Sequence, residues 1–202
     1  EISEFVQRLK KLLSYNLGKE GRQTTLRMEL EIVKEYIALQ QMRYDFIIEM
    51  NIEDGSYLDQ PTVRMLFQPL VENAIRYGLG DDEKISIQVF EDVARHLAVV
   101  TISDSGKGLN QEEIDEINQP FDYDWGYWKN ENRGIGLRYV KAMLESFYDG
   151  QTSLFVNSKK GFGTKITILL PVRKPEEKKE KDKEVTLEEN KVGQTDESID
   201  CR

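Results

Sequence analysis

Apolar residues recur at helical spacing through the first 45 residues of the chain. In the stretch 1–17 they occupy every third or fourth position, which predicts an amphipathic helix: Ile2, Phe5, Val6, Leu9, Leu12 and Leu13. Gly18 and Gly21 interrupt this pattern, and Thr25 is suited to cap a second helix over about 26–45. The apolar stripe of that helix is Leu26, Leu30, Val33, Ile37 and Tyr44. Because the connection is short, we expect an antiparallel helical hairpin.

After residue 45 alternating and helical patterns follow each other. We expect strands at 46–52, 85–89, 97–102 (running into Asp104), about 152–157 and 164–170. We expect helices from Pro61 to near Gly78, at about 111–118 and around Leu137–Phe147. The stretch 119–133 has no period and carries five aromatic residues. Short turns between consecutive strands favour a mixed or antiparallel sheet with helices on one face, an α+β fold built as a two-layer α/β sandwich.

The last thirty residues, 173–202, differ in composition from the rest. Eighteen of them are charged, and they contain too few apolar residues to offset the entropy of ordering. We expect a disordered tail after Pro171; the alternative is a short charged helix around 176–190. The expected organisation is therefore a hairpin at 1–45, a globular domain at 46–172 and a charged tail at 173–202.

The charge and the cysteine content exclude several classes of protein. A net charge of −9 argues against a nucleic-acid binder that relies on general electrostatics and against a basic membrane-surface helix. A single cysteine, Cys201, excludes an intramolecular disulfide, and one histidine with one cysteine nearly excludes a zinc site of those residue types. The longest apolar runs are too short to span a bilayer. We expect a cytosolic piece of a longer protein, with no membrane insertion of its own.

Three segments that contain glycine are candidates for binding chemistry: Asp104–Gly108, Gly134–Leu137 and Gly161–Thr164. None is a Rossmann fingerprint or a Walker A loop, and each alone is typical of a turn. A fourth feature is the polar pair Glu72-Asn73 inside an apolar helix; such a pair needs partners or a cleft. Its plainer explanation is an ion pair between Glu72 and Arg76 on one helix face.

Taken together, these segments favour a nucleotide site. A carboxylate at Asp104 can accept a hydrogen bond from an exocyclic amine, and the glycines beside it let a flat ring approach the backbone. Free N–H groups where Gly134–Gly136 precede a helix suit phosphate. Asn73 offers an amide oxygen to Mg²⁺, which otherwise keeps water and phosphate ligands. The combination can hold an adenine, a metal ion and a triphosphate.

Residues 1–172 resemble the C-terminal part of a bacterial sensor histidine kinase, of the YesM- and LytS-type subfamily, in which a helix-hairpin directly precedes a GHKL-type ATPase domain. Leu66–Ile75 is similar to the N box, Asp104–Gly108 to the G1 box and Gly134–Leu137 to the G2 box. Gly161–Thr164 resembles the last glycine box, and Tyr36–Tyr44 the segment before the first strand. The resemblance implies the Bergerat ATP-binding fold.

It also implies roles for single residues. Asp104 would bind the adenine amino group, with Gly106 and Gly108 shaping the base pocket and Thr164 lining it. Asn73 would ligate Mg²⁺, and Glu72 would be the catalytic residue that orients the acceptor or acts as base. The phosphates would be cradled by Gly134 and Gly136 beneath an ATP lid at 109–133. The remaining candidate nucleotide contacts are Arg76, Tyr77, Arg133, Ile135 and Leu137.

The implied reaction is transfer of the ATP γ-phosphoryl group to a histidine upstream of this fragment. The implied partners are a second copy, through the hairpin, and a response regulator, and the parent would be a membrane-bound sensor. Two positions depart from the family pattern: Arg76-Tyr77-Gly78 stands where Lys-His-Gly is usual, and Asn132 where a glycine is usual. They leave open the alternative of a nucleotide-responsive interaction module without transfer activity. His96 is expected to be a surface residue at a strand edge.

Overall fold

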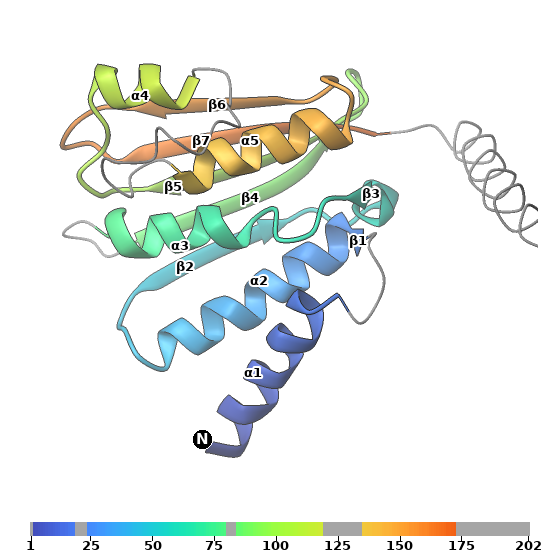
Figure 1. The fold of residues 1–202 in the computed structure, drawn as a ribbon, viewed down its shortest axis with the longest axis vertical. Helices are drawn as coiled ribbons and strands as arrows, with labels where there is room; N and C mark the ends of the chain where they lie inside the picture. Colours follow the sequence, from blue (N-terminus) through green and yellow to red (C-terminus); the bar gives the residue numbers. More distant parts are fainter. Residues whose placement is uncertain (1, 19–23, 80–83, 119–134, 173–202) are drawn as a thin grey trace, which may run out of the picture. The chain divides into compact units, whose positions relative to one another are not determined.

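A five-stranded mixed sheet forms the centre of the fold in the computed structural model, which describes residues 2–18, 24–79, 84–118 and 135–172. The spatial order is β2 (Ile47–Ile52), β4 (Lys84–Asp92), β5 (Leu97–Asp104), β7 (Thr164–Pro171) and β6 (Ser153–Ser158). β2 runs parallel to β4, and the other neighbouring pairs are antiparallel. Helices cover one face of this sheet (Figure 1), so the predicted α/β sandwich is confirmed. The predicted tail and the stretch 119–133 lie outside the described residues.

The core lies between the sheet and two helices, α3 (Gln68–Tyr77) and α5 (Ile135–Phe147). Alternating residues of the central strands are buried on the helix side: Ile85, Ile87, Val89, Ala98, Val100, Ile102, Ile166, Ile168 and Leu170. The helices contribute residues at i, i+3 and i+4 spacing: Leu70, Val71, Ala74, Leu137, Val140 and Leu144. The period of two in the strands and of 3.6 in the helices therefore accounts for both layers.

The register of the central strands places the candidate carboxylate at a sheet end. Asp104 is the last residue of β5 and pairs with Ile85 of β4 on one side and Thr164 of β7 on the other. The next helix, α4 (Gln111–Asn118), follows where the acidic helix was predicted. Asp104 and Thr164, 60 residues apart in sequence, are thus neighbours because of strand pairing.

Residues 2–18 and 24–41 form the predicted hairpin of two antiparallel helices, α1 (Ile2–Asn16) and α2 (Leu26–Gln41). Leu12, Tyr15 and Ile32 are buried between them. Thr25 caps α2 as expected, since its hydroxyl oxygen accepts a hydrogen bond from the Met28 N–H at 3.2 Å. α2 ends four residues before the expected 45, where the Gln41 side-chain amide donates to the Phe46 carbonyl and the chain turns into β2.

The predicted helix from Pro61 to Gly78 is wrong in its first seven residues, because α3 begins only at Gln68. Pro61-Thr62 forms a short strand, β3, which pairs with Thr24-Thr25 of β1. Met65 then adopts a left-handed φ of 57°, which no continuous helix permits. The proline in the first turn of this helix is Pro69 rather than Pro61. A missing N–H costs nothing at this position, because the first N–H groups of a helix have no partner within it.

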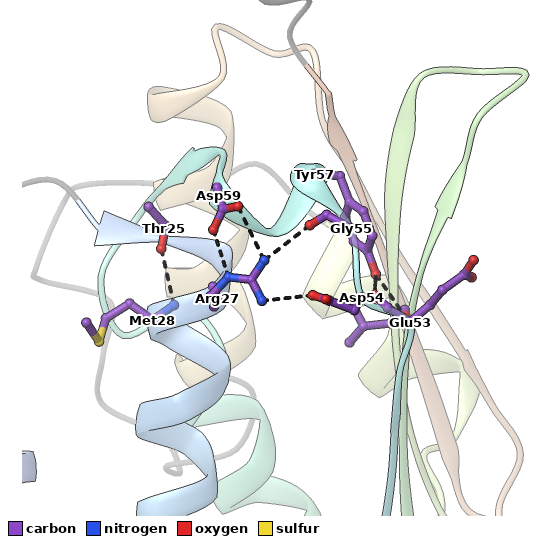
Figure 2. A network of polar contacts seen from close by, with 9 residues as sticks. Thr25, Arg27, Met28, Glu53, Asp54, Gly55, Tyr57 and Asp59 are labelled. Carbon is purple, nitrogen blue, oxygen red and sulfur yellow. Dashed lines mark hydrogen bonds and ion pairs between the residues drawn. The ribbon is translucent and has the colours of Figure 1, made fainter.

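The start of α2 is tied to the loop after β2 by a network of polar contacts (Figure 2). The Arg27 guanidinium bonds to Asp59 at 2.7 Å and to Asp54 at 2.9 Å, and it also donates to the Gly55 carbonyl. The same loop contains a short 3₁₀ turn, Ser56–Asp59. Tyr57 in this turn is buried, and its hydroxyl group donates a hydrogen bond to the Glu53 carbonyl. This network joins the hairpin to the loop after β2, and Glu29, described below, joins it to the segment before α3.

Candidate functional site

A cleft opens at the end of the sheet where Asp104 lies, bounded by α3, α4, α5, β5 and β7. Its lining combines apolar walls with a few polar side chains: Leu70, Asn73, Ala74, Tyr77, Gly78, Ile102, Asp104, Lys107, Gly108, Leu109, Glu113, Ile117, Leu137, Arg138, Thr164 and Ile166. Six of the residues that the sequence singled out are in this set: Asn73, Tyr77, Asp104, Gly108, Leu137 and Thr164. Apolar walls with few polar groups are typical of small-molecule sites.

Asp104 has one carboxylate oxygen fixed by the protein. Its Oδ1 accepts hydrogen bonds from the Gly106 and Thr164 N–H groups, each at 3.1 Å. Burial raises the pKa of this carboxyl, and the two backbone bonds oppose that rise. Among the described residues, none donates a hydrogen bond to Oδ2. Asp104 lines the cleft, so Oδ2 is available to accept a hydrogen bond from an amine of a ligand bound there.

Two glycines let the backbone pack closely beneath Asp104. A Cβ on Gly106 would lie 2.4 Å from the Cα of Gly78, so any larger residue would separate the end of α3 from the loop after β5. Gly108 has a left-handed φ of 64°, and a Cβ there would lie 2.1 Å from the Lys159 carbonyl oxygen. The loop 104–108 therefore holds its shape because glycines occupy both positions.

Asn73 lies at the other end of the cleft, next to the first turn of α5. A Cβ on Gly136 would come within 3.4 Å of the Asn73 amide nitrogen, so the helix start and this amide are neighbours. The first N–H groups of a helix have no partner within it and suit phosphate. Arg133 and Gly134 lie outside the described residues, and of Ile135 only the helical backbone is described.

The polar groups here fit Mg²⁺ held together with a phosphate ligand. No group of three or more His, Cys, Asp or Glu side chains gathers anywhere in the described ranges, so these side-chain types build no metal cage there. Mg²⁺ prefers oxygen ligands and keeps water and phosphate oxygens around it. The amide oxygen of Asn73 is such a ligand, and its place beside α5 would put the ion next to a bound phosphate.

Glu72 and Arg76 lie on α3 but outside the cleft lining. They form an ion pair at 3.0 Å, with their side chains 43% and 60% exposed, as expected of residues at i and i+4. Tyr77 lines the cleft, and the Lys107 ammonium lies 5.0 Å from the centre of its ring. The structure thus brings Asn73 and Tyr77 into the cleft and leaves Glu72 and Arg76 outside its lining.

Sequence reasoning missed several cleft residues. Lys107 stands between two glycines that the motif named, and Arg138 follows Leu137 directly, so both were within reach of that argument. Ser158 is not part of the cleft lining, and no sequence signal pointed to it. Its hydroxyl oxygen accepts from the Leu109 N–H and donates to the Gly163 carbonyl, both at 2.8 Å, and so fixes the loop after β5 against the turn before β7.

Residues 58–174 match the family model described as histidine kinase-, DNA gyrase B-, and HSP90-like ATPase, and residues 1–47 match the model described as histidine kinase. The chain is 30% identical over 168 residues to the sensor protein kinase HptS of Staphylococcus aureus, in strains bovine RF122 / ET3-1 and USA300. That match covers 83% of this chain and 32% of the relative, so the chain spans about a third of the length of these curated relatives.

Two solved structures share the fold. The catalytic domain of histidine kinase ThkA has a TM-score of 0.55 at 16% identity, covering 74% of this chain and 94% of that one. Histidine kinase AdeS of Acinetobacter baumannii has a TM-score of 0.54 at 18% identity, covering 84% of this chain and 77% of that one. None of the helices in the described part of the chain has the length and apolar character needed to cross a membrane. The chain therefore belongs to the histidine kinase-, DNA gyrase B- and HSP90-like ATPase family; its first 47 residues match the histidine kinase model, and the curated relatives are named sensor protein kinases.

Proposed function

We propose that this chain binds Mg·ATP in the cleft and transfers the γ-phosphoryl group to a histidine upstream of it in the parent protein. The observation that carries the proposal is Asp104, with Oδ1 fixed by two backbone N–H groups and Oδ2 left for a ligand amine. The 6-amino group of adenine is such a donor. Ile102, Leu70 and Ile166 supply the apolar walls that a purine ring requires.

With adenine at Asp104 and Thr164, we expect the phosphates to run toward the start of α5, where the N–H groups of Ile135 and Gly136 open the helix. Gly134, which lies outside the described residues, stays a candidate phosphate contact on sequence grounds. Leu137 is buried and lines the cleft at this helix start. Arg133 lies outside the described residues and stays a candidate contact for the γ-phosphate on sequence grounds. Asn73 would hold Mg²⁺ through its amide oxygen, and the ion would supply positive charge against the charge that develops on the phosphate oxygens.

Tyr77 departs from the family pattern, yet a cation is close to it, because Lys107 lies over its ring. The alternative of a module without transfer activity rests on this departure and on Asn132, which lies outside the described residues.

In the transfer step, an imidazole nitrogen of the acceptor forms a bond to the γ-phosphorus while the bond to the β–γ bridging oxygen breaks and ADP leaves. Glu72 accepts a hydrogen bond from the other imidazole N–H and so orients the ring. Its half-exposed position next to Asn73 on α3 suits a group that meets an incoming side chain, and its ion pair with Arg76 is exposed enough to be exchanged for that contact.

The acceptor is not His96, the single histidine of the chain. His96 is exposed in the turn before β5, and Asp104 is the residue at the opposite end of that strand. At about 3.3 Å per residue the strand separates them by roughly 26 Å. The acceptor that we propose therefore belongs to a segment that precedes this chain in the parent.

Two protein partners belong to the proposal. α1 packs on α2 with one face and leaves a second apolar face exposed: Ile2, Phe5, Val6, Leu9, Leu13 and Leu17. A second copy of the hairpin would cover this face, which makes the parent a homodimer. A response regulator would accept the phosphoryl group from the histidine. The relatives are named sensor kinases, which supports a membrane sensor as the parent with this part on the cytoplasmic side, where ATP is present.

Calorimetric titration with Mg·ATP and Mg·ADP tests the binding step. We expect both nucleotides to bind, and omission of Mg²⁺ to weaken ATP more than ADP. Transfer is tested by adding a polypeptide that carries the upstream helix with its histidine and following acid-labile radiolabel. Nucleotide binding without any label on that histidine would leave the nucleotide-responsive module as the function. Absence of nucleotide binding would contradict both the kinase function and the nucleotide-responsive module.

A further inference from the structure

A buried carboxylate connects the hairpin to the helix that carries Asn73. Glu29 lies on α2 with only 1% of its surface exposed. Its Oε1 accepts a hydrogen bond from the Met65 N–H at 2.9 Å, and its Oε2 accepts one from the Leu66 N–H at 2.8 Å. A carboxylate this deeply buried is costly unless several donors surround it, and these donors come from the segment that leads into α3.

These contacts take the place of a local helix cap. Phe67, the residue before α3, offers no side-chain hydrogen bond to the first turn. The negative charge of Glu29, supplied by another helix, instead lies at the start of α3, where the helix dipole favours it. Burial raises the pKa of Glu29, and the N–H groups of Met65, Leu66 and Phe67 oppose that rise. The position of α3 is therefore set by α2 rather than by its own flanking residues.

The backbone at Met65 is strained, so the hydrogen bonds from Glu29 constrain its conformation. Met65 adopts a φ of 57°, a conformation that a residue with a side chain keeps only when its surroundings hold it there. Glu29 bonds to the N–H of Met65 itself and to the next N–H. Loss of these two bonds would let the segment relax, and α3 with it.

The same carboxylate contacts α1. The hydroxyl group of Tyr15, which is 2% exposed, donates to Glu29 Oε1 and lies 2.8 Å from the Thr24 hydroxyl oxygen. Arg64, directly before Met65, donates from Nη1 to the Tyr15 carbonyl at 2.8 Å and lies over the Tyr15 ring at 4.5 Å. A rotation of α1 would withdraw these groups from Glu29 and from the strained segment together.

We propose that Glu29 is a positioning residue for the nucleotide site: it transmits the arrangement of α1 against α2 to α3, and through α3 to Asn73. This inference rests on the proposed Mg·ATP site. Asn73 lies five residues into α3, so a displacement of the helix start reaches the metal ligand without passing through a flexible segment. Coupling of this kind is reciprocal, so nucleotide in the cleft must also stabilise the contact between α1 and α2.

Hydrogen exchange on the full chain, with and without saturating Mg·ADP, tests the coupling. In the wild type we expect nucleotide to slow exchange of the Met65–Phe67 amides and of the last turn of α1 around Tyr15. In Glu29→Gln, an isosteric change that replaces one acceptor by a donor, nucleotide should still bind at saturation, but the response in α1 should disappear. The dissociation constant should rise roughly 5- to 150-fold, the range typical of coupled sites.

Two further variants separate positioning from general stability. Glu31→Gln removes the same charge from an exposed site on α2 and should keep both affinity and the α1 response. Tyr15→Phe removes a single hydroxyl and should reduce the α1 response even if Glu29→Gln fails to fold.

A wild type that binds nucleotide without any change in α1 overturns this inference alone. A wild type that binds no nucleotide overturns the proposed function and this inference with it. Glu29→Gln or Tyr15→Phe with a wild-type α1 response and a lower melting temperature would show a purely structural role.

Discussion

Replacing Asp104 by asparagine should weaken nucleotide binding and raise the stability of the free protein at the same time. The Asn side chain is nearly isosteric, and its oxygen can still accept the N–H bonds of Gly106 and Thr164. What changes is the second atom, because an acceptor oxygen becomes an NH₂ donor that meets the adenine amine. One substitution therefore separates what the carboxylate does for the ligand from what it does for the fold.

The loss of affinity follows from the contact removed. A hydrogen bond to a charged group contributes roughly 1.5–3 kcal/mol, which corresponds to a roughly 10- to 150-fold rise in the dissociation constant. Two donors that face each other add repulsion to this loss, so we expect the upper part of the range. Asp149→Asn is the matched control: Asp149 is exposed, and its left-handed φ of 50° suits asparagine equally well.

The effect on stability has the opposite sign. The unperturbed pKa of Asp104 is 3.8, and burial raises the pKa of the folded state above it. Between these two values the folded protein binds more protons than the unfolded chain, so the free energy of unfolding falls as the pH rises. At neutral pH the charged carboxylate therefore costs stability that asparagine does not. We expect Asp104→Asn to melt at a higher temperature than the wild type at pH 7, with the difference narrowing toward pH 4.

Isothermal titration calorimetry with Mg·ADP and thermal melts between pH 4 and 7 measure both effects. Equal affinity of wild type and mutant would remove Asp104 from the binding site. A mutant that melts lower at every pH would show that the carboxylate stabilises the free fold and that its burial carries no net cost.

Three further outcomes follow from single residues. Val6→Lys on the exposed face of α1 should lower the solution mass per particle measured by light scattering, whereas Gln7→Lys beside it should leave that mass unchanged. An unchanged mass for Val6→Lys would show that the hairpin is not the interface. His96→Ala should leave transfer to an added upstream helix unchanged in a radiolabel assay; a loss would make His96 part of the reaction. Gly106→Ala should lower the free energy of unfolding in urea by about 1–3 kcal/mol through overcrowding, and Gly136→Ala, with 3.4 Å of clearance, by less.

Short-range signals were enough to predict most of the fold. The alternation in β4, β5 and β7 and the apolar stripes of α1, α2 and α5 each depend on a period that the chain displays locally. Thr25 was recognisable as a cap for the same reason, since the group that it caps lies three residues away. Asp104 and Gly108 were found because they belong to one five-residue motif, and both line the cleft.

Features built from distant pairs were not predictable in this way. The two-residue strands β1 and β3 have no period, and they exist because Thr24 and Thr62 meet across 38 residues. Glu72 illustrates a different limit. Its polar character inside an apolar helix left two interpretations, a place in the cleft or an ion pair with Arg76, and the structure shows the ion pair on the exposed side of α3. Whether a polar residue in a helix faces a cleft or the solvent depends on how the helix is rotated against the sheet.

The error at the start of α3 and the proposed role of Glu29 have the same physical origin. From the sequence, the apolar positions Val63, Leu66 and Phe67 continue the stripe of α3, and local propensity extends the helix back to Pro61. In the structure, Glu29 accepts the N–H groups of Met65 and Leu66, and Met65 takes a conformation that ends the helical path. A carboxylate 36 residues away thus decides where α3 begins. A helix whose first residue is set by another element is also a helix that this element can move, which is why the boundary that local reasoning missed is the place where we expect the hairpin to act on the nucleotide site.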